Sequence, residues 1–214
     1  MISSLTQNDR SVKIHRTDNA KAQNMTQSSA TKELLNNRLR EVFIQRGYDG
    51  ATLTHLAAAS GLSKASLYHH FPGGKPEMAM VLLRFAVSDL QQQAFQHLST
   101  NNHPTERLVQ FVEGFSQYTD GGERDCLLAV LSHHLTAHEE TAVHRAAIAD
   151  QFKDWHAQVT GVYESAGMKP KRAAREAHDL LASLYGALLN AKMHNQPKLF
   201  RAAVSRKIKA LTAH

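Results

Sequence analysis

Residues 52–75 constrain the fold of this chain more than any other part of its sequence. They read TLTHLAAASGLSKASLYHHFPGGK, two short helical patterns separated by Gly-Leu-Ser. Thr52 is placed to cap the first helix, because a threonine oxygen accepts a hydrogen bond from a free N–H at a helix start. Gly61 is placed to end it, because glycine adopts the left-handed conformation at little cost, and Ser63 is placed to cap a second helix over residues 64–70. The pattern predicts two helices joined by a tight turn.

The side chains of these two helices divide into an inward and an outward set. Apolar spacing places the inward set at Leu53, Leu56, Ala57, Leu67 and Phe71. The second helix presents short and polar side chains outward, namely Lys64, Ala65, Ser66, Tyr68 and His69. Short residues at the start of a helix allow it to enter the major groove of DNA closely. We therefore predict a DNA recognition helix; the alternative is a helical hairpin packed within a core.

Most of the remaining sequence is also patterned as helix. Ahead of the turn, a helix is expected with Ser29 or Thr31 as its N-cap and Gly47 at its end, burying Leu35, Leu39, Val42 and Phe43. Proline and glycine separate further helical patterns, which we expect at residues 76–98, 105–118, 126–137, 139–166, 171–194 and 198–212. Residues 1–28 lack apolar periodicity and are expected to form a flexible tail. Strand patterns are scarce, so the sequence predicts an all-α fold.

Charge and composition narrow the possible function classes. The formal net charge is +6 at neutral pH, and surface Lys and Arg favour a polyanionic partner such as nucleic acid. The longest apolar stretches fall short of the roughly 20 residues that span a bilayer, and no signal-peptide pattern follows Met1. No membrane association is therefore expected, and the protein is expected in the cytoplasm. The single cysteine, Cys126, fits that reducing compartment.

The motifs within residues 31–83 resemble those of the TetR family of transcriptional repressors. The matching positions follow one another in order as Gly47-Tyr48, Thr52, Leu56-Ala57, Gly61-Leu62-Ser63 and Leu67-Tyr68-His69-His70-Phe71. The segments Phe71 to Lys75 and Asp125 to Leu128 are similar to the LmrA and YxaF branch of that family. The resemblance implies a three-helix DNA-binding domain with a helix-turn-helix over residues 29–76. It also implies a helical ligand-binding and dimerisation domain over residues 77–214.

The resemblance assigns DNA contacts residue by residue. Thr52, Tyr68 and Lys75 are implied to contact DNA phosphates, which set the register of a protein on the duplex. Base edges, which set sequence preference, are implied to lie at or near Ser63, Lys64, Ala65, Ser66 and His69. Two positions depart from the family pattern, because His55 stands where an acidic residue is usual and Ser60 where an alanine is common. We expect both to be tolerated.

Large side chains with polar ends gather in the C-terminal part of the chain. The candidates for lining a small-molecule site are Phe111, Phe115, Tyr118, Phe152, Trp155 and Tyr163. Hydrogen bonds that orient a ligand are expected from Cys126, His134, His156 and Tyr163. Each of these stripes is also typical of ordinary helix packing, and that alternative stays open.

Two histidines, His134 and His138, have the spacing that places two imidazoles on one helix face. No cysteine lies close to them in sequence, and the glutamate that a zincin-type site needs beside the first histidine is absent. The sequence also lacks a nucleophile elbow, a phosphate loop and a dinucleotide fingerprint. It therefore predicts no metal site, no cofactor and no enzyme.

The helices expected at residues 171–194 and 198–212 combine leucines with small residues that allow another helix to approach. They predict a homodimer; the alternative is a pair of core helices within one chain. The resulting hypothesis is a repressor that binds a double-stranded, pseudo-palindromic operator as a dimer and is released by a small-molecule inducer. One alternative is a DNA-binding regulator controlled by a partner protein or by Cys126 oxidation. Another is a helical ligand carrier or enzyme with a vestigial helix-turn-helix.

Overall fold

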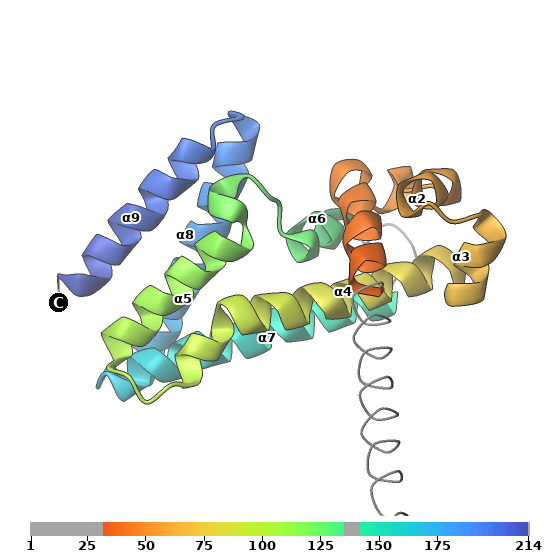
Figure 1. Ribbon diagram of the computed structural model, residues 1–214. Helices are drawn as coiled ribbons and strands as arrows, with labels where there is room; N and C mark the ends of the chain where they lie inside the picture. The colour runs from red at the N-terminus through yellow and green to blue at the C-terminus, as the bar shows by residue number, and fades with distance from the viewer. Residues whose placement is uncertain (1–31, 135–141, 214) are drawn as a thin grey trace, which may run out of the picture.

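The computed structural model describes residues 32–134 and 142–213, and every regular element within them is helical (Figure 1). A first helix covers residues 32–50. It is followed by α2 (Leu53–Ser60), α3 (Lys64–His70), α4 (Gly74–Gln93), the 3-10 turn η1 (Phe95–Ser99), α5 (Pro104–Tyr118) and the 3-10 turn η2 (Asp120–Gly122). The C-terminal half contains α6 (Leu127–His134), α7 (Ala142–Ser165), α8 (Pro170–Met193) and α9 (Pro197–Thr212). The predicted all-α fold is confirmed. The tail predicted at residues 1–28 and the cap predicted at Ser29 or Thr31 lie outside the described residues.

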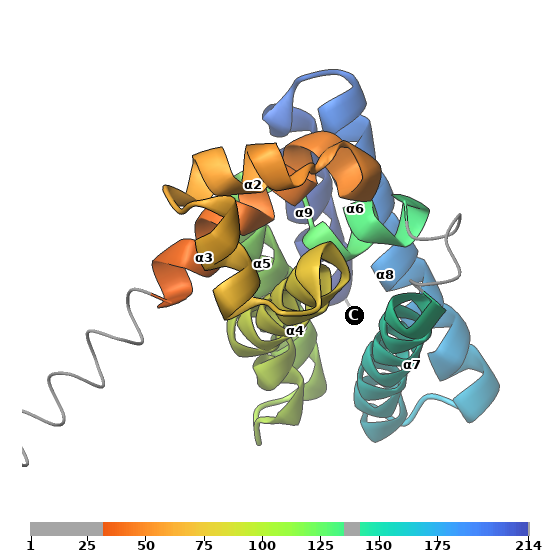
Figure 2. The same ribbon diagram turned by 90° about the vertical axis from the view of Figure 1, so that its right-hand side faces the viewer.

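Two groups of helices lie at opposite ends of the molecule and are joined by α4 (Figure 1). The first helix, α2 and α3 form one group, which we call the reading head (residues 32–73). The other group contains α5, α8 and α9, and α7, which packs mainly against α8, runs along α4 in Figure 1 but is set apart from it in Figure 2. The domain boundary expected after residue 76 falls in the first turn of α4. One continuous helix therefore belongs to both groups.

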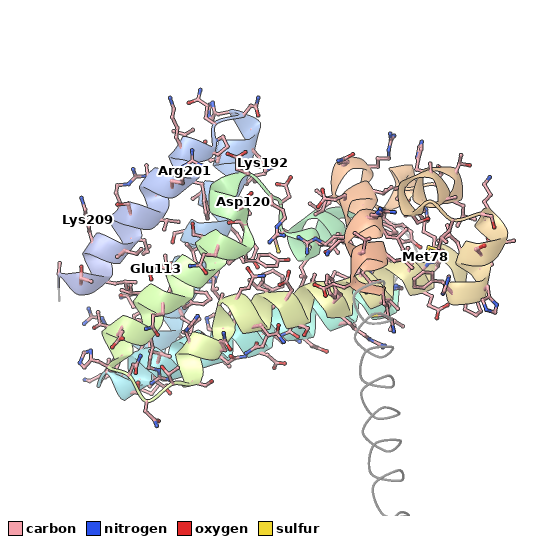
Figure 3. All side chains as sticks on the ribbon, in the orientation of Figure 1. Met78, Glu113, Asp120, Lys192, Arg201 and Lys209 are labelled. Carbon is pink, nitrogen blue, oxygen red and sulfur yellow. The ribbon has the colours of Figure 1, made fainter. Side chains whose placement is uncertain are left out.

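The reading head encloses a small apolar core between its helices and the start of α4. Its fully buried side chains include Leu39, Phe43, Leu56, Leu67 and Met78. Met78 reaches this core from α4 (Figure 3). The predicted inward set is confirmed, because Leu56, Leu67 and Phe71 are buried and Leu53 and Ala57 are half-buried against the core.

An ion pair between a buried arginine and a half-buried aspartate attaches the reading head to α4. Arg40, on the first helix, is 2% exposed, and its Nη1 lies 3.4 Å from Asp89 Oδ2 on α4. Its guanidinium also lies over the ring of Tyr118, 5.8 Å from the centroid, at the end of α5. Asp89 accepts a further hydrogen bond from Gln93. Because Arg40 is almost fully buried, its charge depends on this partner, and the contact joins the first helix to α4.

The prediction of one helix over residues 76–98 is wrong at its C-terminal end, because α4 ends at Gln93. Ala94 leaves helical geometry with φ −125° and ψ −60°, and η1 then turns Phe95 into the core. The Phe95 ring stacks on that of Trp155 in α7, with centroids 4.6 Å apart, and lies 4.8 Å from that of Phe111 in α5. Burying three aromatic rings at one point offsets the helical hydrogen bonds that are lost.

The helices predicted at residues 105–118, 171–194 and 198–212 are confirmed to within one residue at each end. Of those predicted at residues 126–137 and 139–166, the start of the first and the end of the second are confirmed to within one residue, and their other ends lie outside the described residues. In the folded chain α8 packs between α7 and α9, and α5 packs against α9. One face of α8 buries Leu180, Leu181, Leu184 and Leu188. The opposite face exposes Ala182, Ser183, Gly186, Leu189 and Met193. None of the helices in the described ranges has the length and apolar content that a bilayer crossing requires.

Candidate DNA-binding interface

The turn between α2 and α3 has the local chemistry that the sequence predicts. Thr52 Oγ1 accepts a hydrogen bond from the His55 N–H at 3.3 Å, and Ser63 Oγ accepts one from the Ser66 N–H at 3.0 Å. Gly61 adopts φ +73° and ψ +15°, in the left-handed region that favours glycine. These contacts fix where α3 begins and in which direction it projects. The predicted helix-turn-helix is confirmed.

One side of α3 forms an exposed surface at the end of the molecule. Its exposed side chains include Lys64, Ala65, Tyr68 and His69. Tyr68 is 47% exposed despite its large ring, whereas Ser66 is half-buried, with its hydroxyl 2.8 Å from that of Ser63. Leu67, on the other side of the helix, is fully buried. The helix is thus anchored by one face and free on the other, as a recognition helix requires.

The two departures from the family pattern form local hydrogen bonds. The ring Nδ1 of His55 lies 3.0 Å from Gly50 O and donates to that carbonyl, at the end of the preceding helix. Ser60 Oγ donates to Ala57 O at 3.0 Å and accepts from the Leu62 N–H at 3.3 Å. Both side chains therefore satisfy backbone groups at helix ends around α2, which explains how the helix-turn-helix accommodates them.

An open hollow lies where the starts of α2 and α4 meet the end of α3. Its volume is about 500 Å³, and its walls include Thr52, Tyr68, Gly73, Gly74 and Lys75. Helix N-termini carry free N–H groups and the positive end of the helix dipole, both of which favour a phosphate. Two helix starts and a lysine therefore lie together at the residues for which the family resemblance implies phosphate contacts.

Lys75 is held against the reading head beside this hollow. Its Nζ donates to Tyr48 O at 3.1 Å and lies 4.3 Å from the centroid of the Tyr48 ring. Tyr48 is itself buried and stacks on Phe43, with ring centroids 6.2 Å apart. An ammonium has three N–H donors, so the contact with one carbonyl positions the cation and leaves donors for a phosphate.

Replacing Ser63 by Ala should lower the free energy of unfolding by about 1 kcal/mol, because it removes the N-cap of α3. The Ser66 N–H, now 3.0 Å from the Ser63 hydroxyl, then loses its side-chain acceptor. The matched variant Ser63→Thr keeps a hydroxyl and should stay within about 0.5 kcal/mol of the wild type. Urea unfolding at one fixed protein concentration measures the difference. Equal stability of the two variants would contradict the role of the cap.

The side chains predicted to line a ligand site fall into several groups. One group lies in the core, each side chain at most 1% exposed, and contains Phe111, Phe115, Tyr118, Cys126 and Trp155. Phe152 and His156 line a cavity of about 380 Å³ between α6, α7 and α8. Tyr163 is half-buried, and burial raises its pKa to about 12, so its hydroxyl remains a hydrogen-bond donor. The side chain of His134 lies outside the described residues.

A larger cavity of about 570 Å³ lies between α4, α6 and α7. Among the ligand candidates whose side chains the structure describes, none lines it. Its α4 wall repeats at helical spacing, as Met80, Leu83, Arg84, Val87, Ser88, Gln91 and Gln92. A stripe that faces only core is apolar, whereas this one mixes apolar and polar side chains. This mixture of apolar and polar residues at helical spacing is a sequence pattern that indicates a wall facing both core and solvent, and a search for aromatic residues does not find it.

A metal site is not formed within the described parts of the chain, where no three His, Cys, Asp or Glu side chains gather closely enough. The spacing of His134 and His138 suggested one as an alternative. Both side chains lie outside the described residues.

Two protein families match separate parts of the chain. The family described as bacterial regulatory proteins, tetR family, matches residues 38–79. The family described as transcriptional regulator LmrA/YxaF-like, C-terminal domain, matches residues 104–206. Among individual proteins, the HTH-type transcriptional regulator YxaF of Bacillus subtilis (strain 168) is 25% identical over 169 residues, covering 78% of this chain and 83% of YxaF.

Solved structures share the fold. A TetR transcriptional regulator from Chloroflexus aurantiacus J-10-FL superposes with a TM-score of 0.72 at 19% identity, covering 87% of this chain and 96% of that one. AibR, solved in complex with isovaleryl coenzyme A and operator DNA, gives a TM-score of 0.59 at 20% identity, covering 73% and 85%. The first family match lies on the reading head and the start of α4, and the second spans α5 to most of α9. The chain is therefore a transcriptional regulator of the TetR family, with a C-terminal domain of the LmrA/YxaF-like kind.

Proposed function

We propose that this protein is a ligand-responsive repressor that binds a pseudo-palindromic operator as a homodimer. The observation that carries the proposal is the capped helix α3, whose exposed face projects at one end of the molecule (Figure 1). In a two-fold dimer, two such helices enter successive major grooves about one DNA turn apart. The protein acts on DNA, and therefore in the cytoplasm, and its role is regulatory rather than catalytic.

The proposed DNA contacts follow from the position of each side chain on the reading head. Thr52, Tyr68 and Lys75 bind phosphates, because they surround the hollow where α2 and α4 begin. The residues at or near base edges are Ser63, Lys64, Ala65, Ser66 and His69. Lysine donates to guanine O6 and N7, so Lys64, exposed in the first turn of α3, favours a G·C pair.

The proposed dimer forms through α8 and α9. A side chain added at Gly186, on the exposed face of α8, would meet no atom within 4 Å in the protomer. Leu189 and Met193 on this face are 59% and 78% exposed, and Leu199 on α9 is 37% exposed. Exposed apolar side chains beside small residues allow the same helices of a second copy to approach closely. The contact is isologous, because each copy offers the same face.

A small-molecule inducer is proposed because the C-terminal part of the chain has room for one. The two cavities there, of about 570 and 380 Å³, have the size of ligand pockets. The structure of AibR, which has the same fold, contains isovaleryl coenzyme A together with operator DNA. A ligand that binds better to a dimer with differently spaced reading heads lowers the affinity of the dimer for its operator. By thermodynamic linkage, operator DNA lowers the affinity for the ligand by the same factor.

Oxidation of Cys126 has less support as the switch. The thiol is 1% exposed, and burial raises its pKa above the usual value. Its Sγ lies 3.8 Å from the hydroxyl of Tyr185, a half-buried residue. Regulatory cysteines react as exposed thiolates, and this thiol is neither exposed nor ionised.

Fluorescence anisotropy tests the proposed function with two duplexes, one from upstream of the protein's own coding region and one of scrambled sequence. The native duplex should bind at least about 1,000-fold more tightly at physiological salt, as specific operator binding does. Equal and weak binding to both duplexes, with a steep salt dependence, would leave only a basic surface. It would contradict the regulator and favour a ligand carrier.

In the same assay, Lys64→Ala should weaken binding to the native duplex about tenfold or more, because a lost base contact costs about 1–3 kcal/mol. The matched control is Lys171→Ala, which removes the same charge from an exposed position in the first turn of α8. The control should bind as the wild type does. Equal losses for the two variants would show a general charge effect and no base contact by Lys64.

A further inference from the structure

The cavity between α4, α6 and α7, which we call the slot, is partly open to solvent and lies along α4 and α7 between two contacts. At the reading-head end, His144 Nε2 on α7 donates to Pro76 O, in the first turn of α4, at 2.7 Å. At the other end, the ring of Phe95 stacks on that of Trp155 at 4.6 Å. Between these contacts α4 and α7 run along each other but are set apart, and α6 contacts both of them (Figure 2). The cavity of about 570 Å³ occupies this space.

The walls of the slot are apolar over most of their area. Leu83 and Val87 from α4, Leu128 from α6 and Ile148 from α7 all line it. Buried apolar surface of this kind favours a ligand with an apolar body, because each ligand atom that leaves water there lowers the free energy of binding.

Arg84 adds one cationic group to this apolar slot. The residue lies on the α4 wall and is exposed, and none of the described residues forms an ion pair with it. Gln91 and Gln151 add carboxamides from the two facing helices. A guanidinium binds a carboxylate or a sulfonate through paired N–H groups, and such charge-assisted bonds are about twice as strong as neutral ones.

We propose that this slot is the effector site and that its ligand is an amphipathic anion, with its apolar body between α4 and α7 and its anionic group on Arg84. The inference rests on the proposed function as a ligand-responsive regulator and names the ligand class for it. The slot is lined by residues other than the buried aromatic side chains Phe111, Phe115 and Trp155.

The position of the slot explains how a ligand reaches the DNA-binding surface. α4 continues from the reading head without interruption, and Pro76 also lines the hollow beside Lys75. A ligand that separates α4 from α7 lengthens the contact between His144 and Pro76 and turns α4 against the reading head. Because α4 is a single helix, a small displacement in the slot moves α3 as well.

Two fluorescent probes with the same aromatic body test the ligand class in the full-length protein without DNA. The anion is 8-anilinonaphthalene-1-sulfonate, and the neutral probe is N-phenyl-1-naphthylamine. Arg84→Gln should weaken binding of the anion about tenfold or more and leave the neutral probe within about twofold. Ala147→Trp, which fills the slot from an exposed position on α7, should weaken both. The control Arg172→Gln, at an exposed position on α8, should change neither.

Wild-type affinity of Arg84→Gln for the anion, or of Ala147→Trp for both probes, overturns the site. For its role as effector site, the anion should lower the affinity of the wild type for the native duplex at least about fivefold and leave that of Ala147→Trp unchanged. An unchanged wild-type affinity overturns the effector role. If the proposed function is wrong, the protein shows no preference for the native over the scrambled duplex, which is a different result. The probe titrations contain no DNA, so they test the site in either case.

Discussion

Gly114→Ala should lower the free energy of unfolding by about 3 kcal/mol, at the upper end of the range for overpacked interiors. A Cβ at this position of α5 would lie 2.0 Å from Gln93 O and 2.8 Å from Ala94 Cα. Both are backbone atoms at the point where α4 ends, so no side-chain rotation relieves the contact. The substitution forces α5 away from the junction at which α4 turns into η1.

The matched control is Gly161→Ala on α7, where an added Cβ would meet no atom within 4 Å. This variant should be more stable than the wild type by about 0.5–1 kcal/mol, because alanine favours a helix over glycine. Urea unfolding at equal protein concentrations measures both variants. A Gly114→Ala protein as stable as the wild type would contradict the close crossing of α5 over the end of α4.

Gly186→Arg should convert the dimer into monomers and weaken operator binding by about 10² to 10⁴-fold, the gain that linking two binding sites supplies. The position lies among Ala182, Ser183 and Leu189 on the exposed face of α8, and the protomer itself leaves it open. An arginine there stands in solvent in the monomer but prevents the close approach of a second α8. Analytical ultracentrifugation measures the mass, and anisotropy measures operator affinity.

Gly161→Arg is the matched control, since it adds the same charge at an equally open glycine on α7. It should remain dimeric and bind operator as the wild type does. Circular dichroism should show the same helix content for both arginine variants, which separates loss of the dimer from loss of the fold. A Gly186→Arg protein that stays dimeric with unchanged operator affinity would place the interface elsewhere.

The reading head could be predicted from the sequence because its determinants are local. The cap at Thr52, the left-handed Gly61 and the cap at Ser63 each act within three or four residues of the position that they fix. The inward spacing of Leu56 and Leu67 also has the helical period. A pattern of this length contains enough information to define the element before any distant contact forms.

The contacts that were not predicted join residues far apart in the chain. Arg40 and Asp89 form an ion pair between two helices, and α4 ends where the ring of Phe95 stacks on that of Trp155. In neither pair does the sequence around one residue indicate its partner. Apolar periodicity alone therefore predicts a longer α4 than the structure contains. Most of the large aromatic side chains among the ligand candidates, such as Phe111, are buried in the core. The larger cavity lies along the mixed stripe of α4, and no local pattern in the sequence indicates that α6 and α7 enclose it.

A hydroxyl-radical footprint of the wild-type protein on the DNA upstream of its own coding region tests directly whether a dimer reads DNA with two copies of α3. We expect two protected half-sites related by an inverted repeat, with centres about one helical turn apart or slightly more. The protection should disappear for Gly186→Arg at the same protein concentration. A single protected patch without two-fold symmetry, or a uniform weak protection along the duplex, would contradict a dimer that reads DNA with two copies of α3.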